Sequence, residues 1–243
     1  MPKPKRQYAC GLKFPKGTSK VDRILCWKII KSIAVPDDGG EIVVACSGGI
    51  DSTVLAHATA QILKLLGGDS VLTLAYVNHG LRDEVRKEIE HVTTLATELC
   101  AGSAIFTGRT RHGSAVQERA RKKRYYLLSA FCLGKKSYCR LPYLLTAHNA
   151  NDQAETILFR TLTGRKQVGI ATTRDLKWGY LYRPLLAFTR KDIERYAKVF
   201  DLKWCEDSSN STDKYTRNRI RHHLIPWIEA NINPSVVRVL ANG

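Results

Sequence analysis

The sequence contains no apolar run long enough to cross a bilayer. Its most apolar stretch, residues 71–77, has the length of one strand, whereas a membrane-spanning helix needs about 20 such residues. Residues 1–7 carry positive charges with no apolar segment behind them, so we expect no secretory signal peptide. These absences favour a cytoplasmic location, although a basic leader for an organelle is also compatible with the charges.

Paired cysteines are also lacking. The chain has seven cysteines, an odd number, and no two of them form a Cys-x-x-Cys pair. The pattern argues against a disulfide framework and against a zinc site, and it indicates a reducing compartment.

Acidic residues are scarce relative to basic ones. The chain has 39 Lys and Arg against 22 Asp and Glu, which gives a net charge of +17. Residues 1–36 hold nine basic residues and one acid, and further basic clusters lie at residues 119–124 and 217–223. One such cluster is as often a solvated face as a binding site. Three together, uncompensated by acids, favour a nucleic-acid backbone as the partner.

What the chain does contain is an ordinary globular mixture, with 44% apolar and 25% charged residues. Short apolar runs rich in β-branched residues alternate with helical patterns. The expected strands cover residues 42–46, 71–77, 103–107 and 143–147, and the expected helices residues 19–33, 52–66, 84–100, 114–132 and 152–162. This alternation predicts an α/β fold: a doubly wound, mainly parallel sheet with helices on both faces, of the Rossmann-like type.

In such sheets ligands bind at the carboxyl ends of the strands, and the first of these places reads Ser47-Gly-Gly-Ile-Asp-Ser52. Two glycines allow close approach of the backbone, and successive N–H groups with the following helix N-terminus make an anion cradle. Asp51 supplies a carboxylate that can hold Mg²⁺ against phosphates. The run is neither a Walker A loop nor a dinucleotide fingerprint. The alternative is a plain capped glycine turn, which the preceding strand and following helix make the weaker interpretation.

The run Ser-Gly-Gly-x-Asp-Ser resembles the PP-loop of the N-type ATP pyrophosphatases. Five further segments resemble one branch of them, the tRNA(Ile)-lysidine synthetases. In chain order these are Val77-Asn-His-Gly-Leu-Arg82; Ala120-Arg-Lys-Lys-Arg-Tyr125; Leu145-Thr-Ala-His148 with Asp152-Gln-Ala-Glu-Thr156; Arg183-Pro-Leu-Leu186 with Thr189-Arg190; and Glu206-Asp-x-Ser-Asn210 with Thr216-Arg-Asn-x-Ile-Arg221. The loop alone is typical of the superfamily, whereas the ordered set, spanning roughly residues 21–234, is far more specific.

The resemblance implies a ligase that forms a carbon–nitrogen bond. The C2 carbonyl oxygen of a wobble cytidine would attack the α-phosphate of ATP and release pyrophosphate, and the ε-amine of free lysine would then displace AMP to give lysidine. ATP is the implied co-substrate, Mg²⁺ the implied cation, and the tRNA anticodon loop and free lysine the partners. The oligomeric state is open, with a homodimer as one option. The implied organisation is a basic arm over residues 1–20, a PP-loop ATP pyrophosphatase domain over 21–215 and an Arg-rich helical extension over 216–243.

The same resemblance assigns the site residues. ATP is expected to bind Ser47, Gly48, Gly49, Ile50, Asp51, Ser52, Asn78 and His79, with Asp51 also holding the metal. Catalytic roles fall on Asp51, Asp152 and Glu155, and a substrate pocket on His148, Asp152 and Glu155. RNA or phosphate contacts are expected from Arg82, Arg121, Arg124, Arg183, Arg217 and Arg221.

Asp152 and Glu155 lie three residues apart on an expected helix and therefore share a face, where they could hold Mg²⁺ or the ammonium group of lysine. The alternative is that both acids only interact favourably with the helix N-terminus.

The chain departs from the family pattern in three places. Asn149 and Asn151 stand where the family usually has a histidine and an acid, and Thr163 precedes Gly164 where an arginine is common. The sequence also ends shortly after Pro234, where family members usually continue into a helical module that grips the tRNA. We hypothesise that basic residues 1–18 supply that grip, and unchanged tRNA affinity after their deletion would contradict this.

Three other functions fit parts of the sequence. One is a tRNA thiolase of the same superfamily, which typically relies on a Cys-x-x-Cys pair or on a paired catalytic cysteine. The chain lacks the first, and Cys132 with Cys139 is a weak candidate for the second. Another is a ligase that amidates a small molecule, for which a strongly basic surface has no use. The last is a catalytically silent tRNA-binding homologue, which the two asparagines make worth testing.

Overall fold

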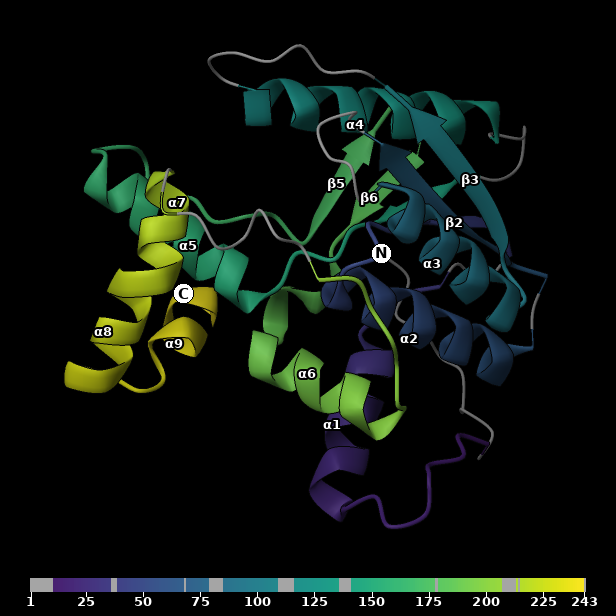
Figure 1. The fold of residues 1–243 in the computed structure, drawn as a ribbon, viewed down its shortest axis with the longest axis horizontal. Helices are drawn as coiled ribbons and strands as arrows, with labels where there is room; N and C mark the ends of the chain where they lie inside the picture. The colour runs from purple at the N-terminus through teal and green to yellow at the C-terminus, as the bar shows by residue number, and fades with distance from the viewer. Residues whose placement is uncertain are drawn as a thin grey trace.

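The computed structural model describes residues 11–35, 39–67, 69–78, 85–108, 116–135, 141–177, 179–206, 213 and 215–242. Within these ranges one sheet has the strand order β3-β2-β1-β4-β6-β5 (Figure 1). The strands are β1 (Glu41–Ala45), β2 (Val71–Asn78), β3 (Gly102–Thr107), β4 (Tyr143–Leu145), β5 (Thr173–Leu176) and β6 (Gly179–Tyr182). All neighbouring pairs are parallel except β5 with β6. The predicted mainly parallel sheet is therefore confirmed.

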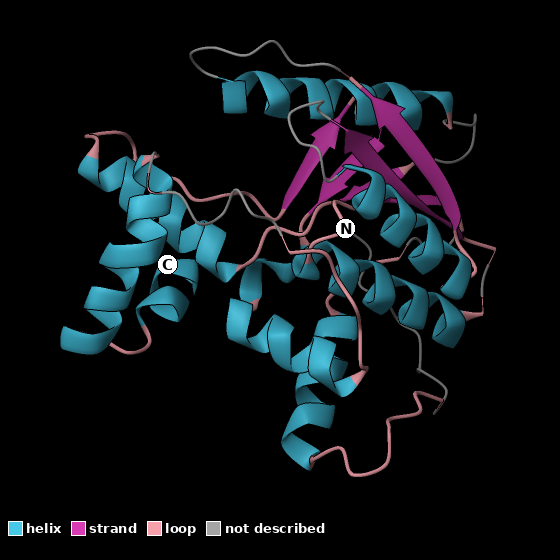
Figure 2. Cartoon of the chain, viewed as in Figure 1, coloured by secondary structure: helices cyan, strands magenta, loops and turns pink. Residues whose placement is uncertain are grey.

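Helices cover both faces of this sheet (Figure 2). The helices are α1 (Lys20–Lys31), α2 (Ile50–Leu66), α3 (Val85–Glu98), α4 (Val116–Gly134), α5 (Ala150–Leu162) and α6 (Arg190–Val199), with a 3₁₀ turn at Pro184–Ala187 before α6. Helices α1, α2, α3 and α6 pack in the core on one face, whereas α4 packs on the other. The predicted doubly wound arrangement is thus confirmed as well.

Strand β1 shows how the sequence divides the two cores. Successive strand side chains point to opposite faces, so Ile42 and Val44 lie in the core with α2, whereas Val43 lies between them in the core under α4. All three are fully buried. A continuous apolar run is what a strand covered on both faces requires.

The ends of the helices follow local rules. The Ser19 hydroxyl accepts the N–H of Asp22 at 3.1 Å and begins α1. Gly67 ends α2 with a left-handed φ of 59°, a conformation that glycine adopts without steric cost. Both boundaries agree with the predicted helices within a few residues.

The C-terminal helices form a third core together with α5. They are α7 (Thr216–Arg219), a π-helical turn at Ile220–Leu224, α8 (Ile225–Asn231) and α9 (Val236–Asn242). Ala150 and Ala154 of α5 pack against buried apolar residues of this segment, including Ile220 and Val237. Helix α5 therefore shares its buried core with the C-terminal helices, beside which it lies in Figure 1.

Strand β1 lies between β2 and β4. From β1 the chain continues to β2 and β3 on one side, and β4 and β6 lie on the other side. The segments after β1 and after β4 therefore leave the same edge on either side of a switch point. This is where ligands bind in open α/β sheets.

Candidate active site

The segment Ser47–Gly49 connects β1 to α2 and folds back on itself. The Ser52 hydroxyl accepts the N–H of Ser47 at 3.1 Å and donates to the carbonyl of Gly49 at 2.9 Å. Gly48 has a φ of 83°, in the left-handed region, so its conformation rather than lack of space requires glycine. The Ser52 side chain thus stabilises the predicted phosphate loop, which leads directly into the N-terminus of α2.

Asp51 lies in the first turn of α2 and faces two other elements. Its carboxylate accepts hydrogen bonds from Arg190 Nη1 at 2.8 Å and from Asn149 Nδ2 at 3.1 Å. Burial raises the pKa of Asp51, and the Arg190 charge opposes this shift. Asn149 caps the N-terminus of α5 and Arg190 is the first residue of α6, so the starts of both helices contribute a partner to this carboxylate in the first turn of α2.

The two asparagines that depart from the family pattern organise this junction. The Asn149 side-chain oxygen caps α5 by accepting the N–H groups of Asn151 and Asp152, at 2.9 and 3.2 Å. Asn151 Oδ1 accepts the backbone N–H of Arg190 at 2.9 Å and so ties α5 to α6. Each side chain therefore links two helices of the site: Asn149 links α5 to α2, and Asn151 links α5 to α6.

Asp152 and Glu155 lie on the same face of α5, as their spacing predicts, and both face Arg221 from the π-helical turn. Arg221 donates to Glu155 through Nε at 2.6 Å and Nη2 at 3.1 Å, and lies 3.6 Å from Asp152. Glu155 is 2% exposed, and burial raises the pKa of its carboxyl against the opposing effect of Arg221. The Asp152 side chain is 30% exposed and is the more accessible acid.

His148 lies in the segment between β4 and α5, where the charges of three arginines influence it. Its Nδ1 lies 3.1 Å from the Thr146 hydroxyl. Burial lowers the pKa of His148 to about 4; Asp152 opposes this, whereas Arg183, Arg121 and Arg124 act in the same direction as burial. The imidazole is therefore neutral at pH 7, in a positively charged surrounding.

Arg183 follows β6 at this edge and is 6% exposed. Its Nη1 donates to the carbonyl of Ala171 at 2.6 Å, whereas its Nε is buried without a hydrogen-bond partner in the described part of the chain. Arg121 lies 5.7 Å from the Tyr125 ring on α4.

The remaining predicted residues lie farther out or outside the described ranges. Asn78 ends β2 at the same edge, and its carbonyl accepts the N–H of Gly108 at 2.8 Å. Arg217 is exposed and donates to the Thr156 hydroxyl at 2.8 Å. His79 and Arg82 lie outside the described residues. Ile50 is buried as the first residue of α2.

Sequence reasoning named Arg190 only as part of a motif and did not place it in the site. Its position was detectable: Thr189 and Asp192 form the capping box of α6, a pattern that puts Arg190 in the first turn of a helix. Nothing local indicated that this turn would meet Asp51, 139 residues earlier in the chain.

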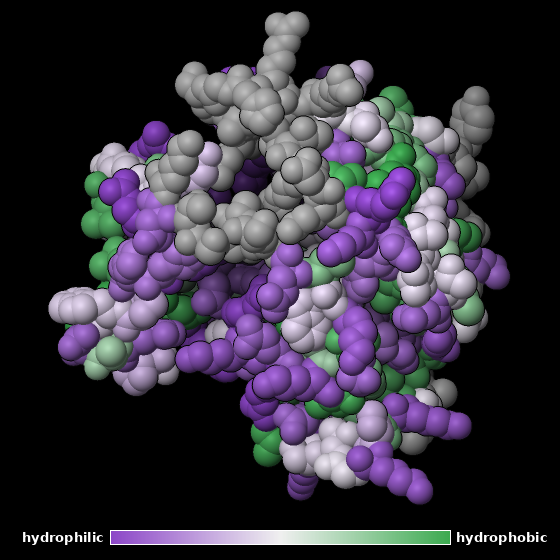
Figure 3. Space-filling view, in the orientation of Figure 1, coloured by the Kyte–Doolittle hydropathy of each residue, from purple (hydrophilic) through white to green (hydrophobic). Residues whose placement is uncertain are grey.

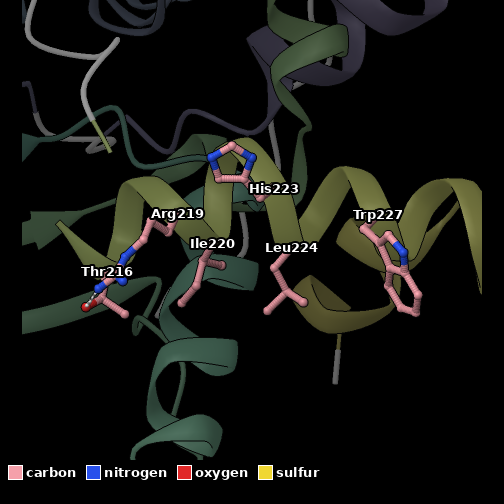
Figure 4. Close-up of a pocket in the computed structure, with 6 residues that line it drawn as sticks. All are labelled: Thr216, Arg219, Ile220, His223, Leu224 and Trp227. Atoms are coloured by element: carbon pink, nitrogen blue, oxygen red, sulfur yellow. Dashed lines mark hydrogen bonds between the residues drawn. The ribbon is translucent and has the colours of Figure 1, made fainter. Parts of the chain in front are cut away.

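A shallow groove of about 530 Å³ lies elsewhere, along α7, the π-helical turn and α8 (Figure 4). It is lined by Thr216, Arg219, Ile220, His223, Leu224 and Trp227. None of the predicted site residues lines it. The face of the molecule seen in Figure 3 is largely hydrophilic around α6, whereas hydrophilic and apolar residues both occur over the C-terminal helices, where Trp227 and Ile232 are exposed.

The described ranges of the chain lack two kinds of feature. They hold no group of three or more His, Cys, Asp and Glu arranged to bind a metal ion. They also hold no helix both long and apolar enough to cross a membrane.

Fold and site together define an α/β domain with a glycine loop at the switch point of a parallel sheet. The chain belongs to the PP-loop domain family, whose model matches residues 25–228. It is 39% identical over 189 residues to the tRNA(Ile)-lysidine synthase of Wolbachia pipientis wMel, covering 76% of this chain and 43% of the relative. It is 33% identical over 205 residues to that of Solibacter usitatus, covering 84% and 44%. The chain thus spans less than half the length of these curated relatives.

A solved structure supports the fold independently. The U34-tRNA thiolase NcsA from Methanococcus maripaludis superposes with a TM-score of 0.73 over 91% of this chain and 77% of that one, at 18% sequence identity. At this identity the likeness concerns the fold alone.

Proposed function

We propose that this chain carries out the ATP-dependent conversion of a wobble cytidine in tRNA(Ile) to lysidine. The observation that carries the proposal is the meeting of the Ser47–Ser52 loop with the acids of α5 at one edge of the sheet, bridged by the Asn149–Asp51 hydrogen bond of 3.1 Å. Similarity to lysidine synthases over most of this chain supports the same reaction.

The first step needs charge stabilisation at phosphate. The cytidine C2 oxygen attacks the α-phosphorus of ATP, and the bond to the β-phosphate bridging oxygen breaks to release pyrophosphate. N–H groups of the loop and the N-terminus of α2 favour the negative charge of the phosphates. Adenylylation turns the C2 oxygen, a poor leaving group, into AMP.

A magnesium ion fits the donors at the loop. Mg²⁺ takes oxygen ligands and is typically held by one or two carboxylates together with substrate phosphates. Asp51 offers a carboxylate that is 27% exposed, and the Asp152 charge is close enough to influence it. Asp51 would hold the ion, which supplies positive charge to the phosphates when bound.

The second step needs an amine positioned beside the modified base. We propose that Asp152, the more exposed acid, receives the ammonium group of lysine, with Glu155 behind it. The ε-amine attacks C2 after losing a proton, the C–N bond forms and the C2–O bond breaks to release AMP. Neutral His148 adds no positive charge to the arginines around it. Arg121 and Arg124 would meet phosphates or the RNA backbone, whereas Arg183, which is 6% exposed, would contribute its charge without direct contact.

Incubation with tRNA(Ile), ATP and lysine, followed by mass spectrometry of the nucleosides, tests the proposal. We expect the wobble cytidine to gain a lysyl group together with pyrophosphate release. Asp51→Asn should abolish that release. Asp69→Asn is the matched control and should leave it unchanged, since Asp69 is exposed and precedes β2 at the opposite edge of the sheet.

Other outcomes separate the alternatives. Pyrophosphate release without lysine consumption would indicate another nucleophile, such as a sulfur donor. Tight tRNA binding with no release of pyrophosphate would indicate a silent homologue. Either result would overturn the proposal.

A further inference from the structure

Arg190 makes three separate contacts at the start of α6. Its Nη1 lies 2.8 Å from Asp51 Oδ2, its Nε lies 3.0 Å from Glu194 Oε1, and its backbone N–H donates to Asn151 Oδ1. The backbone contact and the buried residues Ile193, Tyr196 and Ala197 anchor α6 independently of the Arg190 side chain. The Glu194 contact joins two half-exposed groups one turn apart and contributes little.

The Asp51 contact is of a different kind because of what lies beside it. The carboxylate stands one residue after the first residue of α2, next to the loop that the proposed function gives to the triphosphate. An uncompensated carboxylate there would repel a polyanion at close range, in a partly buried site where screening is weak. Asn149 donates a hydrogen bond but brings no charge. Among the described ion pairs, Arg190 is the cation within 4 Å of Asp51.

We infer that Arg190 is a positioning residue that supplies the counter-charge of Asp51 when no cation is bound, and that it competes with the cation for this carboxylate. It keeps the carboxylate at the loop and neutralises it, so that ATP can approach. The inference rests on the proposed function only in requiring that ATP binds this loop.

Loss of the arginine charge should change the affinities for ATP and for a divalent cation in opposite directions. A variant that merely disturbs the fold would weaken both. ATP measured in EDTA should bind Arg190→Gln about tenfold more weakly than it binds the unaltered chain, because the carboxylate is then uncompensated. Mn²⁺ without nucleotide should bind it about tenfold more tightly, because the carboxylate is then available to an oxygen-preferring ion.

The experiment uses calorimetry for ATP and the EPR signal of free Mn²⁺ for the metal, with the full chain and without tRNA or lysine. Arg195→Gln is the matched control: Arg195 lies on the same helix, forms a similar ion pair with Asp22 at 2.6 Å, and should leave both constants unchanged. Arg190→Lys keeps the charge and should return both constants toward those of the unaltered chain. In an Asp51→Asn background, Arg190→Gln should no longer tighten Mn²⁺ binding.

Each contrary result has a distinct meaning. Weaker binding of both ATP and Mn²⁺ would mean that Arg190 only supports the fold. Weaker ATP binding with unchanged Mn²⁺ binding would mean direct contact with phosphate, and no change in either would mean no role; all three overturn the inference. If the unaltered chain bound no ATP, both the inference and the proposed function would be rejected. Opposite shifts in a chain that makes no lysidine would retain the inference and reject the proposed function.

Discussion

Arg221 holds Glu155 through two hydrogen bonds of 2.6 and 3.1 Å, across 66 positions of sequence. The pair joins the π-helical turn to α5, and the carboxylate is 2% exposed whereas the arginine side chain is 40% exposed. The arginine therefore offsets a buried charge that water cannot reach.

Removing that arginine should destabilise the fold. We expect Arg221→Gln to lower the free energy of unfolding by about 2 to 3 kcal/mol at pH 7, below the cost for a fully buried pair because Arg221 is partly exposed. Urea unfolding measures this. Arg219→Gln is the control, since Arg219 is exposed and bonds only to Thr216 among the contacts described; it should cost at most about 0.5 kcal/mol.

The same variant should acquire a pH dependence of known sign. Without Arg221, burial raises the pKa of Glu155 further above its usual range, so the folded state binds a proton that the unfolded state has released. Stability then falls as pH rises from the unfolded pKa through the folded one. The destabilisation of Arg221→Gln should be smaller at pH 5 than at pH 7, and an equal loss at both would contradict this.

His57 should make the chain sensitive to acid. Its Nδ1 lies 2.9 Å from the Tyr196 hydroxyl inside the core, and burial lowers the pKa of His57 to about 4. Between pH 6.5 and 4 only the unfolded state binds the proton. The stability that depends on neutral His57 is therefore complete above this window and is lost as pH falls through it. We expect His57→Gln to reduce the stability lost between pH 7 and pH 5 by about 2 kcal/mol, seen by urea unfolding at each pH.

Tyr196→Phe is the companion variant for that measurement. It removes the hydrogen-bond partner but keeps the histidine buried, so the chain should lose about 1 kcal/mol at pH 7. Its loss of stability on acidification should stay close to that of the unaltered chain. A flat pH profile in this variant would mean that Tyr196, rather than burial, sets the pKa of His57.

Asn149 combines a cap with a link, and two substitutions separate these roles. Asn149→Ala removes both and should cost about 1 to 2 kcal/mol in thermal or urea unfolding. Asn149→Ser keeps an oxygen able to cap α5 but is too short to replace the contact with Asp51, so it should recover most of the stability. If the two variants were equally unstable, the link to Asp51 would matter more than the cap.

The basic residues near the N-terminus can be tested while Phe14 is kept in the chain. Phe14 packs 5.9 Å from the Phe200 ring, so deletion of residues 1–18 would also remove core contacts. Deletion of residues 1–10 removes Lys3, Lys5 and Arg6 and leaves Phe14 in place. We expect weaker tRNA binding and a logarithmic salt dependence shallower by about 2, with unchanged ATP affinity. An unchanged salt slope would exclude an RNA contact by these residues.

Sequence patterns predicted the elements whose signals are local. The apolar run of β1, the cap at Ser19 and the spacing of Asp152 and Glu155 each depend on a few adjacent residues, and the structure agrees with all three. Strands β5 and β6 were not predicted. Thr173–Leu176 is a mostly exposed edge strand that carries polar residues, so no apolar alternation marks it.

The relations within the site were harder to predict because they are not local. Arg217, Arg219 and Arg221 form one basic cluster in the sequence, yet Arg221 turns toward the acids of α5 whereas Arg219 bonds within its own turn. The partners of Asp51 come from segments separated from it by 98 and 139 positions. Only the tertiary fold, which brings the first turns of α5 and α6 next to α2, decides which charges meet.

The Arg221–Glu155 contact also sets an order of assembly during synthesis. The loop that begins at Ser47 is translated early, Arg190 much later, and Arg221 close to the end of this chain. A nascent chain can therefore form its glycine loop while the carboxylate of Glu155 still lacks its counter-ion. The acids of α5 reach their final arrangement only after the segment that carries Arg221 has left the ribosome and docked.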